Sequence, residues 1–244
     1  MSAAAIFEPA RFARLAASDA MNIARDPMLA FATAMSIVPA IAFVLTRDQM
    51  DASGVALGVE QISRYVAPVA LVLPAFLIGW VTGFLLLEDR DEGMLGALDI
   101  TPIGKAGFLA YRSAVTALVT FALTLVACLL IVPDLSLWLQ VLIAILVAAE
   151  AVISATILPA FARNKVEGLA LTKLVNIAAI TVLLAAIPSP LRFVGGIVPS
   201  FWVGELLALT DIGAMPIWIS AILALLVHAG VVIVLLKIFA RRAG

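Results

Sequence analysis

The sequence has few charged residues and almost no cysteine or histidine. Only 13% of its 244 residues are charged, against roughly 25% in soluble domains, while 64% are hydrophobic and the mean hydropathy is +1.19. This composition excludes a soluble globular domain. A net charge of −1 and a pI of about 5.8 give no indication of nucleic-acid binding. The one cysteine, Cys128, excludes an internal disulfide.

The motifs of nucleotide, metal and hydrolytic sites are also missing. No Gly-x-x-x-x-Gly-Lys-Ser/Thr segment occurs, so the chain has no phosphate loop of its own. The single histidine, His228, has no Cys, Asp or second His at ligand spacing, which favours a packed neutral imidazole. An intramembrane serine protease is disfavoured because no Gly-x-Ser lies in an apolar stretch. We therefore expect no catalytic residue, no metal and no cofactor in this chain.

Long apolar stretches make up most of the sequence. A helix that rises 1.5 Å per residue needs about 20 mostly apolar residues to cross a bilayer. Six stretches meet this requirement: 28–46, 66–87, 107–132, 137–161, 168–187 and 217–239. The sequence therefore predicts an all-α integral membrane protein, with a six-helix transmembrane bundle over residues 28–244.

The basic residues are divided unequally between the two sides of this bundle. Lys and Arg gather in the cytoplasmic loops of membrane proteins. If the N-terminus is cytoplasmic, only Arg47, Arg64 and Arg192 of the fifteen lie outside. The remaining twelve are Arg11, Arg14, Arg25, Arg90, Lys105, Arg112, Arg163, Lys165, Lys173, Lys237, Arg241 and Arg242. We expect a multi-pass protein of the cell inner (cytoplasmic) membrane with both termini in the cytoplasm.

The segment before the first span, residues 1–27, has a helical pattern of its own. Polar side chains such as Arg14 and Ser18 recur on one face, and apolar ones such as Phe12 and Ala16 on another. This period predicts an amphipathic helix lying in the membrane interface. The alternative is a basic tail that only sets the orientation.

The segment 188–216 is apolar but is interrupted by prolines and glycines. Broken backbone at membrane depth is tolerated only where protein or a water-filled cavity surrounds it. We therefore expect an external re-entrant hairpin, with Trp202 near the lipid headgroups and Glu205 facing protein or water.

Glu150 is the one carboxylate deep inside a predicted span. A charge at the bilayer centre costs at least ~2.5 kcal/mol on insertion scales. Two interpretations stay open: a polar point on a substrate or proton pathway, and a protonated or hydrogen-bonded contact between helices. The first supports an alternative function, a proton-coupled secondary transporter that uses Glu150. The lack of a matching carboxylate in another span speaks against that alternative.

The loop at 88–105, after the second span, carries the clearest functional pattern. It begins with five successive charges and continues with a short segment whose apolar side chains follow helical spacing until Pro102. A short amphipathic helix presented to the cytosol can lie on the membrane or fit a groove of a soluble partner. The side chains on this face are Met94, Leu95, Leu98 and Thr101.

This loop resembles the first cytoplasmic loop of the permease subunits of type-2 ABC exporters. In that family a Gly is followed by Leu two and five residues later and by Thr-Pro eight and nine residues later, as at Gly93, Leu95, Leu98, Thr101 and Pro102. The resemblance covers the whole chain and is greatest to the compact fluoroquinolone-export permeases. The acidic run is longer than is usual in the family, so both Glu88 and Asp89 are candidates for its glutamate position.

The resemblance implies a permease that forms half of a translocation pathway for an amphipathic cargo, such as a drug, a lipid or a peptide. Its loop would be a coupling helix seated on a separate cytoplasmic ABC ATPase subunit, which would bind ATP-Mg. The implied contact residues are Glu88, Glu92, Gly93, Leu95, Leu98, Thr101 and Pro102. A second permease copy or a sister permease would complete the pathway, on which Glu150 and Glu205 are candidate polar residues. Membrane lipids are the other expected partners, and nucleic acid is not expected.

Overall fold

The computed structural model describes residues 9–56, 58–59, 61–94, 104–210, 213 and 215–242. Within these residues the regular structure is helical and no strand is found. The elements are α1 (Pro9–Arg25), α2 (Pro27–Met35), α3 (Val38–Ala56), α4 (Ile62–Asp91), α6 (Gly104–Ile131), α7 (Leu137–Phe161), α8 (Lys165–Ile180), the 3₁₀ helices η3 (Thr181–Ala186) and η4 (Pro190–Ile197), α9 (Pro199–Leu206) and α10 (Ile217–Arg242).

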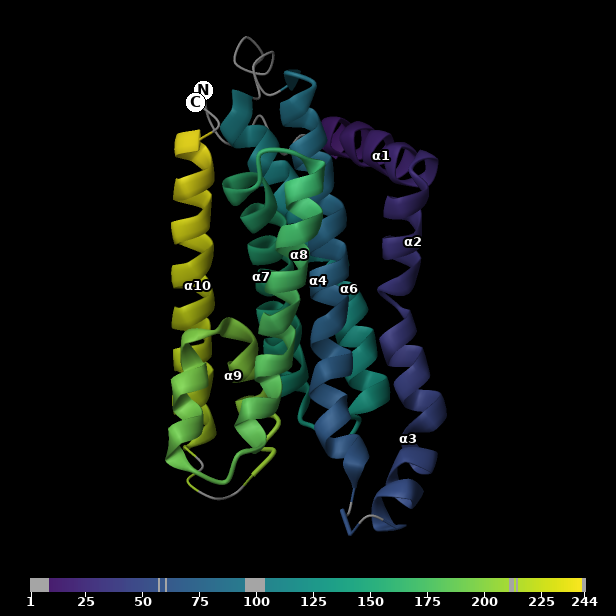
Figure 1. Cartoon of the computed structure of the whole chain (residues 1–244), viewed down its shortest axis with the longest axis vertical. Coiled ribbons are helices and arrows are strands. Elements are labelled where there is room, and N and C mark those ends of the chain that lie inside the picture. Colours follow the sequence, from purple (N-terminus) through teal and green to yellow (C-terminus); the bar gives the residue numbers. More distant parts are fainter. Residues whose placement is uncertain are drawn as a thin grey trace.

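The predicted all-α membrane fold is confirmed. Six helical segments of the described chain are long and apolar enough to cross a membrane: 27–56, 62–91, 104–131, 137–161, 165–186 and 217–239. Figure 1 shows them side by side along the long axis of the molecule. The first span consists of α2 and α3 in succession, and the fifth of α8 and η3.

The helices α4 and α7 form the centre of the bundle. In each of these two helices 72% of the residues in the apolar 18-residue stretch are buried, against 17–33% in the corresponding stretches of the other four spans. Two glycines on α4 allow the close approach: a Cβ added at Gly79 would lie 2.5 Å from the Ser154 Cβ, and one at Gly83 would lie 2.6 Å from a Leu158 methyl group. This is the packing that small residues four apart permit between membrane helices.

Helix α1 lies across one end of the bundle, nearly perpendicular to the spans (Figure 1). Its turn into α2 is fixed by Asp26, whose carboxylate accepts hydrogen bonds from the backbone N–H groups of Met28 and Leu29, as expected of an N-cap residue. Leu15 and Ile23 pack against the bundle. The described part of the segment, Pro9–Arg25, is helical as predicted, residues 1–8 lie outside the described residues, and the position of the helix in a membrane interface stays a prediction.

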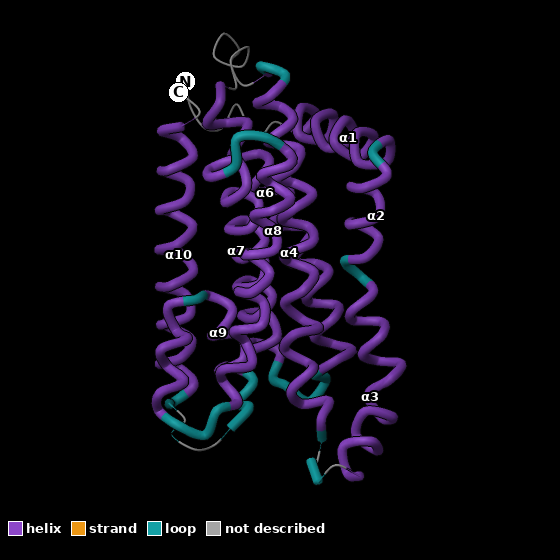
Figure 2. The backbone as a smooth tube through the Cα atoms, viewed as in Figure 1, coloured by secondary structure: helices purple, strands orange, loops and turns teal. Residues whose placement is uncertain are grey.

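The segment after η3 forms a hairpin at the opposite end of the bundle. Figure 2 shows η4 running back along the spans and α9 returning after a short turn. The residues of α9 from Ser200 to Leu206 are buried. Trp202 is 5% exposed and its indole N–H donates to the Gly196 carbonyl oxygen, so its ring is enclosed by protein rather than presented to headgroups. The hairpin is therefore part of the packed bundle.

Candidate functional site

The predicted coupling loop lies between the end of α4 and the start of α6, at the α1 end of the bundle. Glu88, Glu92 and Gly93 are at the end of α4, where Gly93 has a φ of +73° that favours glycine. The Glu88 carboxylate accepts from the Lys165 ammonium at 2.9 Å. The other predicted contact residues, Leu95, Leu98, Thr101 and Pro102, lie outside the described residues.

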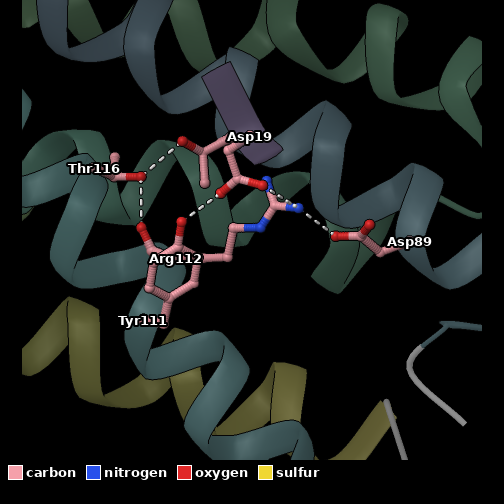
Figure 3. Close-up of polar contacts among 6 residues, drawn as sticks. Asp19, Asp89, Tyr111, Arg112 and Thr116 are labelled. Carbon is pink, nitrogen blue, oxygen red and sulfur yellow. Dashed lines mark hydrogen bonds and ion pairs between the residues drawn. The ribbon is translucent and has the colours of Figure 1, made fainter. Parts of the chain in front are cut away.

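A buried ionic network joins the two helices that flank this loop to helix α1 (Figure 3). The Arg112 side chain is 4% exposed, and its Nη2 lies 2.8 Å from Asp89 Oδ2 and 3.2 Å from Asp19 Oδ1. The Tyr111 hydroxyl donates to Asp19 Oδ2 at 2.8 Å. Arg112 and Tyr111 belong to α6, Asp89 to α4 and Asp19 to α1, so this network links three elements at the base of the loop.

The electrostatics of the network rest on one guanidinium shared by two carboxylates. Burial raises the pKa of the Asp19 carboxyl above its ordinary value, although the charge of Arg112 and the Tyr111 hydrogen bond both oppose this shift. The Arg112 Nε and Nη1 atoms are buried without a hydrogen-bond partner, and the guanidinium carbon lies 5.0 Å from the centre of the Phe108 ring. The Arg112 charge therefore compensates one buried carboxylate, Asp89, and one partly buried carboxylate, Asp19.

The sequence reasoning did not predict this network. Arg112 was counted only as a basic residue on the cytoplasmic side, and neither Asp19 nor Asp89 was expected to bind it. An arginine inside an apolar stretch is itself a signal, because a buried guanidinium needs a carboxylate partner. The sequence could therefore indicate that a partner exists but not which carboxylate it is.

A polar pocket of about 450 Å³ opens beside the network. It lies between the turn from α1 to α2 and the end of α4, with Glu88 and Glu92 among its walls. The other lining residues are Asn22, Arg25, Asp26, Pro27, Leu85, Asp89 and Met94. Two of the predicted ATPase-contact residues thus border an open polar surface at the base of the loop.

Glu150 lies inside the bundle and contacts two other elements. Its side chain is 3% exposed; Oε2 lies 3.1 Å from the Ser200 hydroxyl of α9, and Oε1 lies 3.4 Å from His228 Nε2 of α10. His228 Nδ1 is 2.7 Å from the Ala224 carbonyl oxygen. The histidine is buried, as predicted, but its place beside Glu150 was not predicted. The geometry is that of a hydrogen-bonded contact between helices, the second of the two interpretations.

Glu205 also faces protein, as predicted, but its partner is different. Arg192 Nε donates to one carboxylate oxygen at 3.0 Å and Nη2 to the other at 3.2 Å. Nη2 also donates to the Gly213 carbonyl oxygen. Arg192 was placed on the external side by the count of basic residues, and no partner was predicted for it; the structure shows it 2% exposed. The bidentate pair joins η4 to α9, the two arms of the hairpin, and the bond to Gly213 joins the hairpin to the loop that follows it.

An apolar cavity of about 500 Å³, wide open to the surface of the bundle, lies along α6, α7 and α10, and its lining residues Leu118 and Ile145 are exposed. Its lining residues are Ala114, Ala117, Leu118, Phe121, Ile145, Ala148, Ala149, Val152 and Val232. Neither Glu150 nor Glu205 is among them. Small and aromatic side chains without a charge suit an apolar or amphipathic ligand. Within the described residues, no three His, Cys, Asp or Glu side chains are grouped so that they could hold a metal ion.

Comparison with known proteins gives two kinds of match. The family model of the Rv2686c-like fluoroquinolones export permease proteins matches residues 19–236. Two curated relatives from Mycobacterium tuberculosis, fluoroquinolones export permease proteins MT2760 of strain CDC 1551 / Oshkosh and Rv2686c of strain ATCC 25618 / H37Rv, are each 28% identical over 151 residues. The matches cover 55% of this chain and 58% of each relative, so the chain spans just over half the length of these relatives. No solved structure matches the chain significantly.

Proposed function

We propose that this chain, which belongs to the Rv2686c-like family of fluoroquinolones export permease proteins, is the membrane-spanning subunit of an ATP-driven ABC exporter. The observation that carries this proposal is the family match over 19–236, which includes the first five spans and the sixth as far as residue 236. The family is one of export permeases, and the chain is accordingly a multi-pass membrane protein of a transport system. That this permease is coupled to an ATPase subunit is the part of the proposal that goes beyond the family match.

In this proposal the loop between α4 and α6 is the coupling helix. Glu88, Glu92, Gly93, Leu95, Leu98, Thr101 and Pro102 would contact a separate ABC ATPase subunit, and ATP-Mg would be bound there rather than by this chain. The Arg112 network supports this role because it joins both flanks of the loop to α1. A force on the loop would therefore move these elements together, which is what a two-state permease needs.

The orientation follows from the ends of the helices. Helix α1, the end of α10 and the flanks of the loop lie at one end of the bundle (Figure 1). We place this end in the cytoplasm because the basic residues favour that side. The membrane would be the inner (cytoplasmic) membrane, and the hairpin of η4 and α9 would face the outside.

The cargo we propose is an amphipathic molecule, and a drug of the fluoroquinolone class is the first candidate because both relatives are named for its export. The apolar cavity between α6, α7 and α10 supports an apolar or amphipathic ligand. Six spans would form half of the pathway, so a second copy or a sister permease would complete it.

The runner-up is a proton-coupled secondary transporter that uses Glu150. One observation favours it: His228 gives Glu150 a titratable partner from another span, which the sequence alone did not reveal. The two functions differ in whether an ATPase must be present for transport.

Co-purification of the partner tests the proposal. The chain, tagged at its C-terminus, is extracted from its host membranes in mild detergent, and the proteins that accompany it are identified. We expect an ATPase subunit with a phosphate loop, and we expect Leu95→Asp with Leu98→Asp to abolish its recovery without affecting membrane insertion. The matched control is Val55→Asp with Val59→Asp, two exposed apolar residues at the opposite end of the bundle, which should leave recovery unchanged.

Two results would contradict the coupling role. Full recovery of the ATPase with the Leu95 and Leu98 variant would exclude this loop as the contact. A preparation without any ATPase that still transports a fluoroquinolone in liposomes, driven by a proton gradient, would instead establish the secondary transporter.

A further inference from the structure

The tip of the hairpin meets the centre of the bundle at a small polar cluster. Ser200 is the second residue of α9, directly after the turn that separates α9 from η4, and Figure 2 shows this turn lying among the spans. Its hydroxyl contacts Glu150 of α7, which in turn lies beside His228 of α10. All three residues are 2% exposed. The cluster is the point at which the hairpin is joined to two spans.

The hydrogen-bond geometry fixes how many protons this cluster holds. The Ala224 carbonyl oxygen can only accept, so His228 Nδ1, at 2.7 Å, carries a hydrogen. The other ring nitrogen, Nε2, faces Glu150 Oε1 at 3.4 Å. If neither of these two atoms carried a proton, two lone pairs would face each other in a buried site. One proton must therefore lie between them, either on the carboxyl oxygen or on the ring nitrogen.

No fixed cation compensates Glu150 in the described part of the chain. The other buried titratable or charged side chains on the elements packed around the cluster are Asp89, Tyr111, Arg112, Cys128, Arg192 and Glu205. The ionic ones are paired among themselves, in the Arg112 network and in the Arg192–Glu205 pair. None of the six has a hydrogen bond or an ion pair with Glu150 or His228. A buried carboxylate without such a partner is costly, so its neutralisation falls to the shared proton.

We infer that Glu150 and His228 form a proton-binding site, and that the bound proton holds α10, against which α9 of the hairpin packs, to α7. The proton comes from water and returns to water, and no other bond is made or broken. This inference concerns the bundle itself and does not rest on coupling to an ATPase.

Loss of the proton would break the contact between Glu150 and His228. The carboxylate and the unprotonated Nε2 would repel each other, which separates α10 from α7, while the Ser200 hydroxyl would still donate to the carboxylate. The apolar cavity adjoins this contact, since Ala149 precedes Glu150 and Val232 lies one turn after His228. Proton release would therefore open the bundle beside that cavity.

Fluorescence of Trp202 tests the inference, because this residue is 5% exposed and lies in α9, which packs against α10 and would lose part of its cover when α10 separates from α7. In a variant with Trp80, Trp138 and Trp218 replaced by Phe, we expect the emission to shift to longer wavelength when the pH is raised from acidic to alkaline. Glu150→Gln should abolish this shift entirely, because its amide N–H can donate to Nε2 but does not titrate.

Two control variants isolate the site. Ser154→Ala alters a buried polar residue one turn from Glu150 on α7 and should keep the full shift. Glu205→Gln removes the other buried carboxylate of the hairpin region and should also keep it. A shift that persists in Glu150→Gln, or one that is lost in Glu205→Gln but kept in Glu150→Gln, would overturn the inference.

Hydrogen exchange gives a second measurement on the chain with all its tryptophans. The amides of residues 199–206 should exchange faster in the unaltered chain than in Glu150→Gln at alkaline pH, and equally fast at acidic pH. Comparison at the same pH cancels the intrinsic pH dependence of exchange. Equal rates of the two proteins at alkaline pH would show that Glu150 does not bind a releasable proton.

Discussion

The two buried polar clusters of this chain bury carboxylates in different ways. At the α1 end, Asp19 and Asp89 share the guanidinium of Arg112, which stays protonated under all physiological conditions. At the hairpin tip, Glu150 faces a histidine, whose charge depends on a bound proton. The first cluster is thus a permanent link between helices, whereas the second can be broken by a change of protonation.

This difference matches the position of each cluster. The permanent link lies at the base of the proposed coupling loop, where rigidity transmits force. The titratable contact lies between two spans and the hairpin, beside the apolar cavity, where a reversible opening is useful for transport. A permease needs both kinds of contact if a partner is to move the end that carries the coupling loop while the bundle separates beside the hairpin.

Removal of the permanent cation should have the largest effect on stability. Arg112→Met leaves the buried carboxylate of Asp89 and the partly buried one of Asp19 without compensation, and we expect a loss of about 3–5 kcal/mol in unfolding free energy. Denaturation in mixed micelles measures this loss. Additional Asp19→Asn and Asp89→Asn changes should recover most of it, and Arg47→Met, at an exposed arginine, is the control. A full-size loss in Arg47→Met, or none in Arg112→Met, would contradict the assignment.

An added methyl group at the hairpin should have the next largest effect. The Cβ of Gly204→Ala would lie 2.2 Å from the Val182 carbonyl oxygen of η3, so the backbone must shift, at an expected cost of about 1–3 kcal/mol. Gly230→Ala in α10 meets nothing within 4 Å and should stabilise the helix by up to about 1 kcal/mol. Thermal unfolding of both variants measures these changes. Neither substitution alters Glu150 or His228, so the difference between the variants reports backbone packing at the hairpin and not protonation.

Asp19→Asn should change stability less at neutral pH, by under about 1 kcal/mol, because Asp89 still binds Arg112. Asp19→Asn should have a clearer effect on how the free energy of unfolding depends on pH. The pKa of Asp19 is raised by burial above its ordinary 3.8, so the folded state binds this proton more tightly than the unfolded state. The resulting stabilisation is complete below 3.8 and is lost as the pH rises through the raised value. Unfolding curves over this range should show the contribution in the original chain and not in Asp19→Asn.

The smallest effect is expected at the exposed pair of Lys165 and Glu88, whose side chains are 45% and 36% exposed. Lys165→Met should cost less than about 0.5 kcal/mol, because exposed ion pairs contribute little. It should also leave ATPase recovery unchanged, whereas Glu88→Gln should reduce recovery with equally little effect on stability. A large stability change in either variant would show that this pair belongs with the permanent link.

The spans could be predicted because their signal is local. Each needs only a run of apolar residues, and all six were found with ends within a few residues of the helices, apart from the longer first span. The broken segment at 188–216 was likewise predicted to fold back because its prolines and glycines are adjacent in sequence. Helix α1 was predicted from its period, and its Asp19 escaped notice because a single acidic residue does not alter that period.

The partners inside the bundle could not be predicted from the sequence. Glu150 and His228 are 78 positions apart, and their meeting depends on how α7 and α10 are rotated about their axes. The same holds for Arg112 and Asp19, which were treated as unrelated charges. Arg192 was assigned only a side of the membrane, from the count of basic residues, and its contact with Glu205 depends on how the hairpin folds. The residues of the coupling loop from Leu95 to Pro102 stay a prediction.

The two glycines of α4 decide which parts of the bundle can move. With their backbones in direct contact at Gly79 and Gly83, α4 and α7 cannot slide past each other without side chains colliding with carbonyl groups. The two helices therefore move together as one rigid body. A force applied at the end of α4 must then move the less buried outer helices relative to this rigid pair. Among the outer helices, α10 contacts α7 through the proposed shared proton, so its separation from α7 would depend on protonation.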